Sequence, residues 1–247
     1  MKLPISYGRQ YISDGDIQAV VETLKSDYLT CGPKIPEFEQ AFCEYVHAKY
    51  SVAVCNATAA LHIAAMALGV KEGDNVICTP MTFASSANCI RFCGGNVKFV
   101  DIDPETYLLD INKLKEILST APKGTYKGMV LVDFAGYPHN MEEYRKVADE
   151  YGMWILEDAC HAPGAYFIDS TGERVYCGCG KYSDITVFSF HPVKHITTGE
   201  GGMACTQNKE YYEKMALYRT HGITHEAEKL QREDGLWSVS YTHLRAH

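Results

Sequence analysis

The sequence predicts an α/β fold of three layers built on a mainly parallel sheet. Short apolar runs without polar alternation recur along the chain, as in strands that are buried on both faces. Segments with apolar residues at helical spacing separate these runs. The chain has 247 residues, 46% of them hydrophobic and 22% charged, which is an ordinary globular composition. This composition excludes collagen-like, disordered and coiled-coil proteins.

The first part of the chain predicts two helices. Ser13 and Asp16 have the spacing of a capping box, and apolar residues at helical spacing follow as far as about Asp27. A second set of apolar residues, from Ile35 to Val46, marks another amphipathic helix.

From Tyr50 onward the pattern predicts alternating strands and helices. Strands are expected at 51–55, 75–79, 97–101, 128–133, 153–157 and 185–190. Helices are expected at 58–68, 83–92, 111–118 and 141–151. After about Arg219 the chain becomes polar with a helical pattern, and residues 238–247 continue neither period. Ligands of such a fold bind beyond the carboxyl ends of the strands.

Charge and cysteine content narrow the class of protein. There are 23 basic and 31 acidic side chains, a net charge of −8, and no dense run of Lys or Arg, so a nucleic-acid partner is not expected. The ten cysteines are scattered through apolar runs, which predicts reduced thiols. No uncharged apolar stretch reaches the length of a membrane span, and no apolar leader is seen, so the expected compartment is the cytoplasm.

Two segments together suggest a pyridoxal phosphate site. One apolar run ends in Glu157 and Asp158, with His161 three residues after Asp158. Another leads through an aromatic stretch to Lys194 and then to a glycine-rich turn. Taken alone, the first is typical of a strand end that faces water and the second of a surface lysine. Together they supply a lysine that can hold the aldehyde and a carboxylate that can keep the pyridine nitrogen protonated.

Two further segments complete this hypothesis. Around Ala57 and Thr58 a strand turns into a helix through small residues, which is either a phosphate anchor or a simple helix cap. Phe83 heads the next helix and either stacks on a flat ring or belongs to the core. Cys177 and Cys179, even with Cys160 nearby, lack the paired spacing of a zinc site, so we expect no metal. Dinucleotide and P-loop fingerprints are absent from the sequence.

Seven ordered motifs resemble those of the DegT/DnrJ-type sugar aminotransferases. They lie at 56–61, 79–83, 100–103, 157–162, 189–194, 197–202 and 219–223. The resemblance implies the large pyridoxal phosphate domain of an aspartate aminotransferase-like, fold type I enzyme, with the small C-terminal domain missing. It divides the chain into an N-terminal segment (1–36), the cofactor domain (37–237) and a tail that looks non-native (238–247).

The resemblance also implies a role for particular residues. Lys194 would form the imine and Asp158 would pair with the ring nitrogen, which makes these two the catalytic residues. The other cofactor contacts implied are the phosphate ligands Ala57, Thr58 and Ser189, the stacking ring of Phe83, and His161 at the ring hydroxyl. The substrate pocket would be lined by Tyr7, Asp27, Tyr28, Leu29 and Thr30.

The implied reaction is a transamination with glutamate as the expected amino donor. The opening residues resemble most the members that act on a UDP-linked 4-keto-6-deoxy-N-acetylhexosamine in pseudaminic acid synthesis, and the family implies a homodimer. A dTDP-linked hexose or UDP-4-keto-arabinose is the alternative substrate. An inactive truncated fragment and a Cys/His metal-binding protein are the alternatives from other classes.

Overall fold

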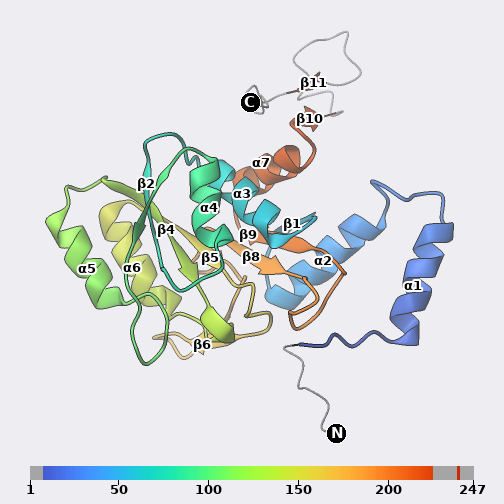
Figure 1. Ribbon diagram of the computed structural model, residues 1–247, viewed down its shortest axis with the longest axis horizontal. Coiled ribbons are helices and arrows are strands. Elements are labelled where there is room, and N and C mark those ends of the chain that lie inside the picture. The colour runs from blue at the N-terminus through green and yellow to red at the C-terminus, as the bar shows by residue number, and fades with distance from the viewer. Residues whose placement is uncertain (1–7, 225–237, 240–247) are drawn as a thin grey trace, which may run out of the picture.

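The computed structural model describes residues 8–224 and 238–239, and it shows a three-layer α/β fold (Figure 1). The central sheet has the strand order β1-β9-β8-β5-β4-β2-β3. Its strands are β1 (Tyr50–Val54), β2 (Asn75–Cys78), β3 (Asn96–Phe99), β4 (Tyr126–Val132), β5 (Trp154–Asp158), β8 (Ile185–Ser189) and β9 (Gly202–Thr206). The helices are α1 (Asp14–Lys25), α2 (Lys34–Val46), α3 (Ala57–Ala67), α4 (Ser85–Phe92), α5 (Ile111–Thr120), α6 (Met141–Tyr151) and α7 (Lys209–Arg219), with a 3-10 turn η1 (Phe134–Gly136).

The sheet is mainly parallel, as the sequence predicts. All six expected strands are present. Five of them pair in parallel with their neighbours, in the order β3, β2, β4, β5 and β8. The sixth, β1, points the same way, because β9 pairs antiparallel with both β1 and β8. The strand β9 was not predicted from the sequence, although all five of its residues are buried.

Both faces of the sheet are covered, which explains the apolar strands. Val76 and Cys78 of β2 face the core formed with α3, α4 and α7. Ile77, between them, faces the opposite core, formed with α5 and α6. A strand whose successive side chains enter two cores has no polar face.

The helix α2 covers the remaining part of the second face. Its Phe42 and Val46 lie in a third core with Phe188 and Phe190, which come from the end of β8. The rings of Phe42 and Phe188 meet edge to face with centroids 5.0 Å apart. This aromatic cluster supports the strand end from which the Lys194 loop leaves.

The helix α1 forms as expected but contributes nothing to these cores. Ser13 and Asp16 make the predicted capping box. No residue of α1 is buried, and its apolar residues Ile17, Val20 and Leu24 are more than half exposed. In Figure 1 this helix stands apart from the layers.

The last described elements differ in part from the sequence expectation. The helix α7 ends at Arg219, and the helical pattern expected after it falls mostly on residues 225–237. A turn leads from it to the short strand β10 (Ile223–Thr224), which pairs with β11 (Ser238–Val239), while 225–237 lie outside the described residues. A hairpin of β6 (Tyr166–Ile168) and β7 (Arg174–Tyr176) was not predicted either. Within 8–224 and 238–239, no helix combines the length and apolarity that a membrane span needs.

Candidate active site

The candidate site lies at the carboxyl edge of the parallel strands. Asp158 is the last residue of β5, and the Lys194 loop follows β8. The helix α3 begins directly after β1. The antiparallel strand β9 starts at this same edge, where Gly202 pairs with both Val54 and Ser189. The topology therefore gathers motifs from distant parts of the sequence at one place, as expected for an α/β fold.

Asp158 is a buried carboxylate held in one orientation. Its side chain is only 5% exposed. The hydroxyl of Ser86, on α4, donates to Oδ2 at 2.6 Å, and the backbone N–H of Cys160 donates to Oδ1 at 3.2 Å. Both oxygens are thus engaged by neutral donors, and the charge of Asp158 contributes to the raised pKa of the Cys160 thiol, which is caused mainly by burial.

Lys194 lies in a loop that the end of β8 organises. The hydroxyl of Ser189 accepts from the backbone N–H of His191 at 3.3 Å, and the carbonyl of His191 in turn accepts from the N–H of Lys194 at 2.9 Å. Thr198 closes the loop by donating its N–H to the carbonyl of Phe190 at 3.1 Å. The half-buried Lys194 therefore projects from a hydrogen-bonded turn at the edge of the sheet.

His161 lies within the electrostatic reach of Lys194 and Asp158. Burial lowers the pKa of His161, and the positive charge of Lys194 lowers it further, while the carboxylate of Asp158 opposes both effects. Its Nδ1 accepts a hydrogen bond from the backbone N–H of Ala135 at 3.3 Å. The structure thus brings Lys194, Asp158 and His161 together, as the sequence predicts.

The N-terminus of α3 offers free donors beside these residues. Asn56 caps the helix by accepting from the N–H of Ala59 at 2.9 Å. The hydroxyls of Thr58 and Ser85 are 2.6 Å apart, which joins the first turns of α3 and α4. Since the first amides of a helix point at an anion and the helix dipole favours it, this end of α3 suits a phosphate group.

Gly202 allows the end of α3 to approach β9 closely. A Cβ atom at this position would lie 2.5 Å from the carbonyl carbon of Asn56 and 2.6 Å from the N of Ala57. Both neighbours are backbone atoms, so they could move aside only at a large cost in energy. The absence of a side chain at Gly202 therefore sets where the first amides of α3 lie relative to Ser189, its partner across the ladder.

The ring of Phe83 is not part of the core. It is 76% exposed and lies just before α4. Of the two interpretations that the sequence left open, this exposure contradicts the core residue, and stacking on a flat ring stays a prediction. The two interpretations at Ala57 and Thr58 are compatible with each other, because the side chain that caps the helix belongs to Asn56.

The role of the predicted substrate residues stays a prediction. Tyr7 lies outside the described residues. The stretch from Asp27 to Thr30 is exposed and connects α1 with α2, and its hydrogen bonds are local, such as that between Tyr28 N–H and Ser26 Oγ at 3.3 Å. Gly8 does lie beside the lysine loop, since a Cβ there would be 3.9 Å from Val193 Cα.

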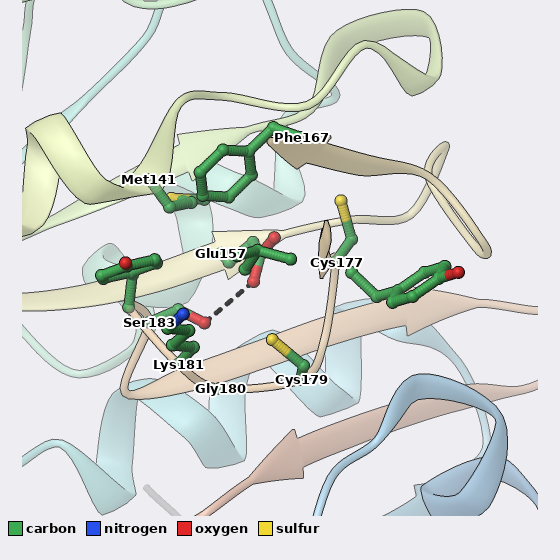
Figure 2. Close-up of a pocket in the computed structure, with 11 residues that line it drawn as sticks. Met141, Glu157, Phe167, Cys177, Cys179, Gly180, Lys181 and Ser183 are labelled. Carbon is green, nitrogen blue, oxygen red and sulfur yellow. Dashed lines mark hydrogen bonds between the residues drawn. The ribbon is translucent and has the colours of Figure 1, made fainter. Parts of the chain in front are cut away.

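A buried acidic cluster lies behind Asp158. A carboxylate oxygen of Asp133, one of Glu157 and the Sγ atom of Cys177 all lie within 4.8 Å of one another, and all three residues are buried. Glu157 and Cys177 line a cavity of about 10 Å³, with Ser183 donating to Glu157 Oε2 at 2.9 Å (Figure 2). Burial raises the pKa of Asp133 to about 7 and that of Glu157 to about 8, so this cluster carries protons at neutral pH.

Sequence reasoning missed the residues that support the site from other elements. Ser85 and Ser86 begin α4 and contact Thr58 and Asp158, but nothing in their local sequence marks them. Ala135 is recognisable only after the fold is known, because its partner is 26 residues away. Sequence proximity associates Cys177 with other cysteines, whereas the structure groups it with two carboxylates.

Comparison with known proteins identifies relatives of this chain. The model of the DegT/DnrJ/EryC1/StrS aminotransferase family matches residues 10–241. A UDP-4-amino-4,6-dideoxy-N-acetyl-beta-L-altrosamine transaminase of Campylobacter jejuni is 41% identical over 220 residues, which cover 89% of this chain and 56% of the relative. The chain thus spans about half the length of the curated relatives that it matches.

The solved structures that superpose on this chain include aminotransferases as well. Helicobacter pylori PseC, an aminotransferase of pseudoaminic acid biosynthesis, superposes with a TM-score of 0.80 at 31% identity, covering 89% of this chain and 56% of that one. The PLP form of a putative sugar aminotransferase of Streptococcus pneumoniae, Spr1654, has a TM-score of 0.79 at 28% identity, covering 96% and 61%.

Proposed function

Because this chain belongs to the DegT/DnrJ/EryC1/StrS aminotransferase family, whose solved relatives hold pyridoxal phosphate, we propose that it carries the cofactor site of a sugar transaminase. The observation that carries this proposal is the meeting of Lys194 and Asp158 at one edge of the sheet. The Lys194 charge acts on both Cys160 and His161, the residues that follow Asp158. A lysine amine and a buried carboxylate at one edge of the sheet are the two groups that this cofactor requires.

The residues present fit the cofactor's phosphate. The free amides at Ala57 and Thr58, the Thr58 hydroxyl and the Ser189 hydroxyl lie around the start of α3. Gly202 leaves the space that keeps these groups together. We assign these residues to the phosphate because backbone amides and hydroxyls bind an anion in a protein with a net charge of −8 and no basic cluster in its sequence.

The residues around Asp158 fit the cofactor's ring. Asp158 would receive the ring nitrogen, His161 the ring hydroxyl, and Phe83 one face of the ring. When bound, the cofactor supplies an electron sink for the carbon that loses its proton. Lys194 would hold the cofactor through its amine in the resting enzyme and would serve as the proton carrier once released. Ser86 holds Asp158 in one orientation, which would keep the carboxylate available to the ring nitrogen.

The proposed substrate is a UDP-linked 4-keto-6-deoxy-N-acetylhexosamine, with glutamate as the amino donor. The names of the Campylobacter and Helicobacter relatives support this class, which belongs to pseudaminic acid synthesis. Tyr7 and the Asp27–Thr30 stretch are proposed to line the sugar pocket. Another nucleotide-linked keto sugar, a dTDP-hexose or UDP-4-keto-arabinose, is the alternative, and an inactive fragment is the alternative in which no turnover occurs.

The assembly and compartment are proposed as well. A homodimer would give the exposed apolar face of α1 a partner surface. All ten cysteine thiols are free, which suits the reducing cytoplasm. The proposed division of the chain is an N-terminal segment (1–36), a cofactor domain (37–237) and a tail (238–247).

The experiment that tests the function follows the covalent bond to Lys194. The purified chain is incubated with pyridoxal phosphate, reduced with borohydride and digested for mass spectrometry, and the cofactor is expected on Lys194. Lys194→Ala should trap none, while Lys98→Ala, at an exposed position of β3, should trap as much as the wild type. Cofactor found on another lysine, or on none, would refute the assignment.

A turnover assay then tests the substrate. The chain with cofactor is given each nucleotide-linked keto sugar with glutamate, and formation of 2-oxoglutarate is measured. Asp158→Asn should lower the rate by about 10²-fold or more, because it removes the charge beside the ring nitrogen. Turnover faster with a dTDP-linked sugar would contradict the proposed substrate, and cofactor binding without any turnover would favour the inactive fragment.

A further inference from the structure

The imidazole of His161 has a tautomer that the backbone determines. The N–H of Ala135 points at His161 Nδ1 with an N···N distance of 3.3 Å. A backbone N–H can only donate, so Nδ1 must present its lone pair and the ring proton must be on Nε2. No group among residues 8–224 makes a hydrogen bond with Nε2. Within this part of the chain, the ring's donor atom is therefore free for a ligand.

We propose that the turn at 133–136 is a positioning device that holds His161 as a neutral Nε2–H donor aimed at the hydroxyl oxygen of the cofactor ring. The inference rests on the proposed function for the identity of the ligand, but the tautomer itself does not. The positioning residues are Asp133, Ala135 and Gly136, none of which touches the cofactor in this proposal.

The turn needs two left-handed residues in order to reach His161. Ala135 has a φ of 55° and Gly136 a φ of 85°. A left-handed alanine is uncommon and is kept only where the surroundings require it. A Cβ on Gly136 would lie 2.7 Å from the carbonyl oxygen of His161, so the turn packs directly on the backbone of that histidine. The Phe134 ring also meets the His161 ring, with centroids 6.3 Å apart.

Asp133 holds the turn in place through hydrogen bonds to His139 and Asp158. Its Oδ1 accepts the backbone N–H of His139 at 3.0 Å and lies 3.0 Å from His139 Nδ1, and both side chains are fully buried. Its own N–H donates to the carbonyl of Asp158 at 3.1 Å, which ties the turn to β5. Residues 133 and 139 are thus held together, and the segment between them has little freedom to move Ala135 away from His161.

The charges around His161 favour the neutral ring. Burial lowers the pKa of His161, Lys194 and His195 lower it further, and Asp158 raises it. Protonation would also place a proton on Nδ1 against the N–H of Ala135, which would break that hydrogen bond. Like the amide of a glutamine, a neutral imidazole donates a directional hydrogen bond and adds no second positive charge beside Lys194.

Nuclear magnetic resonance of the chain with ¹⁵N-labelled histidine, free of cofactor, tests the tautomer. The His161 signals are identified as those that disappear in His161→Gln. We expect Nε2 protonated and Nδ1 unprotonated from neutral pH down to a midpoint below the ordinary pKa of 6.5. A ring protonated on Nδ1 in the wild-type chain would overturn the proposal.

Two glycine substitutions separate positioning from general strain. Gly136→Ala should displace the turn, so that the Nδ1–H form appears and the His161 midpoint moves up toward its ordinary value. Gly172→Ala is the matched control, because Gly172 has a φ of 83° but no atom lies within 4 Å of the place that its Cβ would take. It should leave the His161 signals unchanged. Identical His161 spectra in the two variants would show that the turn does not set the tautomer.

Cofactor binding supplies the second readout. His161→Ala should weaken pyridoxal phosphate binding by roughly tenfold, the usual effect of one lost hydrogen bond, and His161→Gln should recover most of it. Equal binding by all three chains would show that Nε2 does not contact the cofactor. A chain that binds no cofactor would refute the proposed function, while the resonance experiment would still decide the tautomer.

Discussion

The hydroxyl of Ser86 lies 2.6 Å from Oδ2 of Asp158, although the two residues are 72 positions apart in the sequence. Ser86 is fully buried, and its Oγ is also 2.7 Å from the hydroxyl of Thr82. A hydroxyl has one proton, and a charged acceptor binds it more strongly than a neutral one. Ser86 therefore donates to Asp158 and accepts from Thr82, and this short chain fixes the carboxylate at the end of β5.

Removal of this donor should weaken both the fold and the cofactor site. We expect Ser86→Ala to lower the free energy of unfolding by about 1.5–3 kcal/mol, because a buried carboxylate oxygen loses its partner. Urea unfolding measures this, and fluorescence titration measures the expected loss of pyridoxal phosphate affinity. Ser119→Ala, on the exposed side of α5, is the control and should change stability by less than about 0.5 kcal/mol. Unchanged stability and affinity in Ser86→Ala would contradict this role.

Addition of one methyl group at Gly202 should disturb the start of α3. The new Cβ would meet backbone atoms of Asn56 and Ala57 at 2.5–2.6 Å, so we expect a loss of about 1–3 kcal/mol in stability. Phosphate affinity should fall with it, because the amides of the first turn move. Gly15→Ala in α1 is the control, since its Cβ would make only an ordinary contact at 3.5 Å. It should stabilise the helix slightly. Gly202→Ala with wild-type stability and affinity would show that the close approach is not needed.

The sequence allowed the sheet to be predicted, and with it the place of Asp158 and Lys194 at its carboxyl edge, but not the residues that support them. Apolar strands and the chemistry of Asp158 and Lys194 are local features, and the carboxyl edge of a parallel sheet brings such residues together. The contacts of Ser86 and Gly202 depend instead on the register between distant elements. The strand β9 was missed because its run is short and begins in a glycine turn. The exposure of Phe83 could not be predicted from its helical spacing either.

The buried acids Asp133 and Glu157 should make the protein less stable at alkaline pH. Burial raises their pKa values from 3.8 and 4.5 to about 7 and about 8, so the folded chain binds more protons than the unfolded chain between these limits. The stability contribution of each group is therefore complete below its unfolded pKa and is lost as the pH rises through its folded pKa. Urea unfolding should give a lower free energy at about pH 9 than at about pH 6.

Replacement of Glu157 tests the origin of this pH dependence. Glu157→Gln keeps an oxygen for the hydroxyls of Ser183 and Thr186 but cannot ionise, so the decline toward alkaline pH should become shallower. Glu116→Gln, on the exposed face of α5, should leave the decline as it is in the wild type. If Glu157→Gln and the wild type decline in parallel, the acid pair is not the cause.

The same substitution at a leucine of α1 and at a leucine of the core should change the free energy of unfolding by different amounts. Leu114 of α5 is fully buried, whereas Leu24 of α1 is 63% exposed. Leu114→Ala should cost about 2–5 kcal/mol through lost burial and a cavity. Leu24→Ala should stay within about 0.5 kcal/mol at a protein concentration too low for the proposed homodimer, since leucine and alanine are both good helix formers, and it should cost more where the homodimer forms. Urea unfolding at two protein concentrations measures both. A large, concentration-dependent cost at Leu24 would mean that α1 is buried against a second copy, as the proposed homodimer requires, because subunit association stabilises by mass action. A large cost that does not depend on concentration would mean that α1 packs on its own chain, which would contradict the exposed position of this helix.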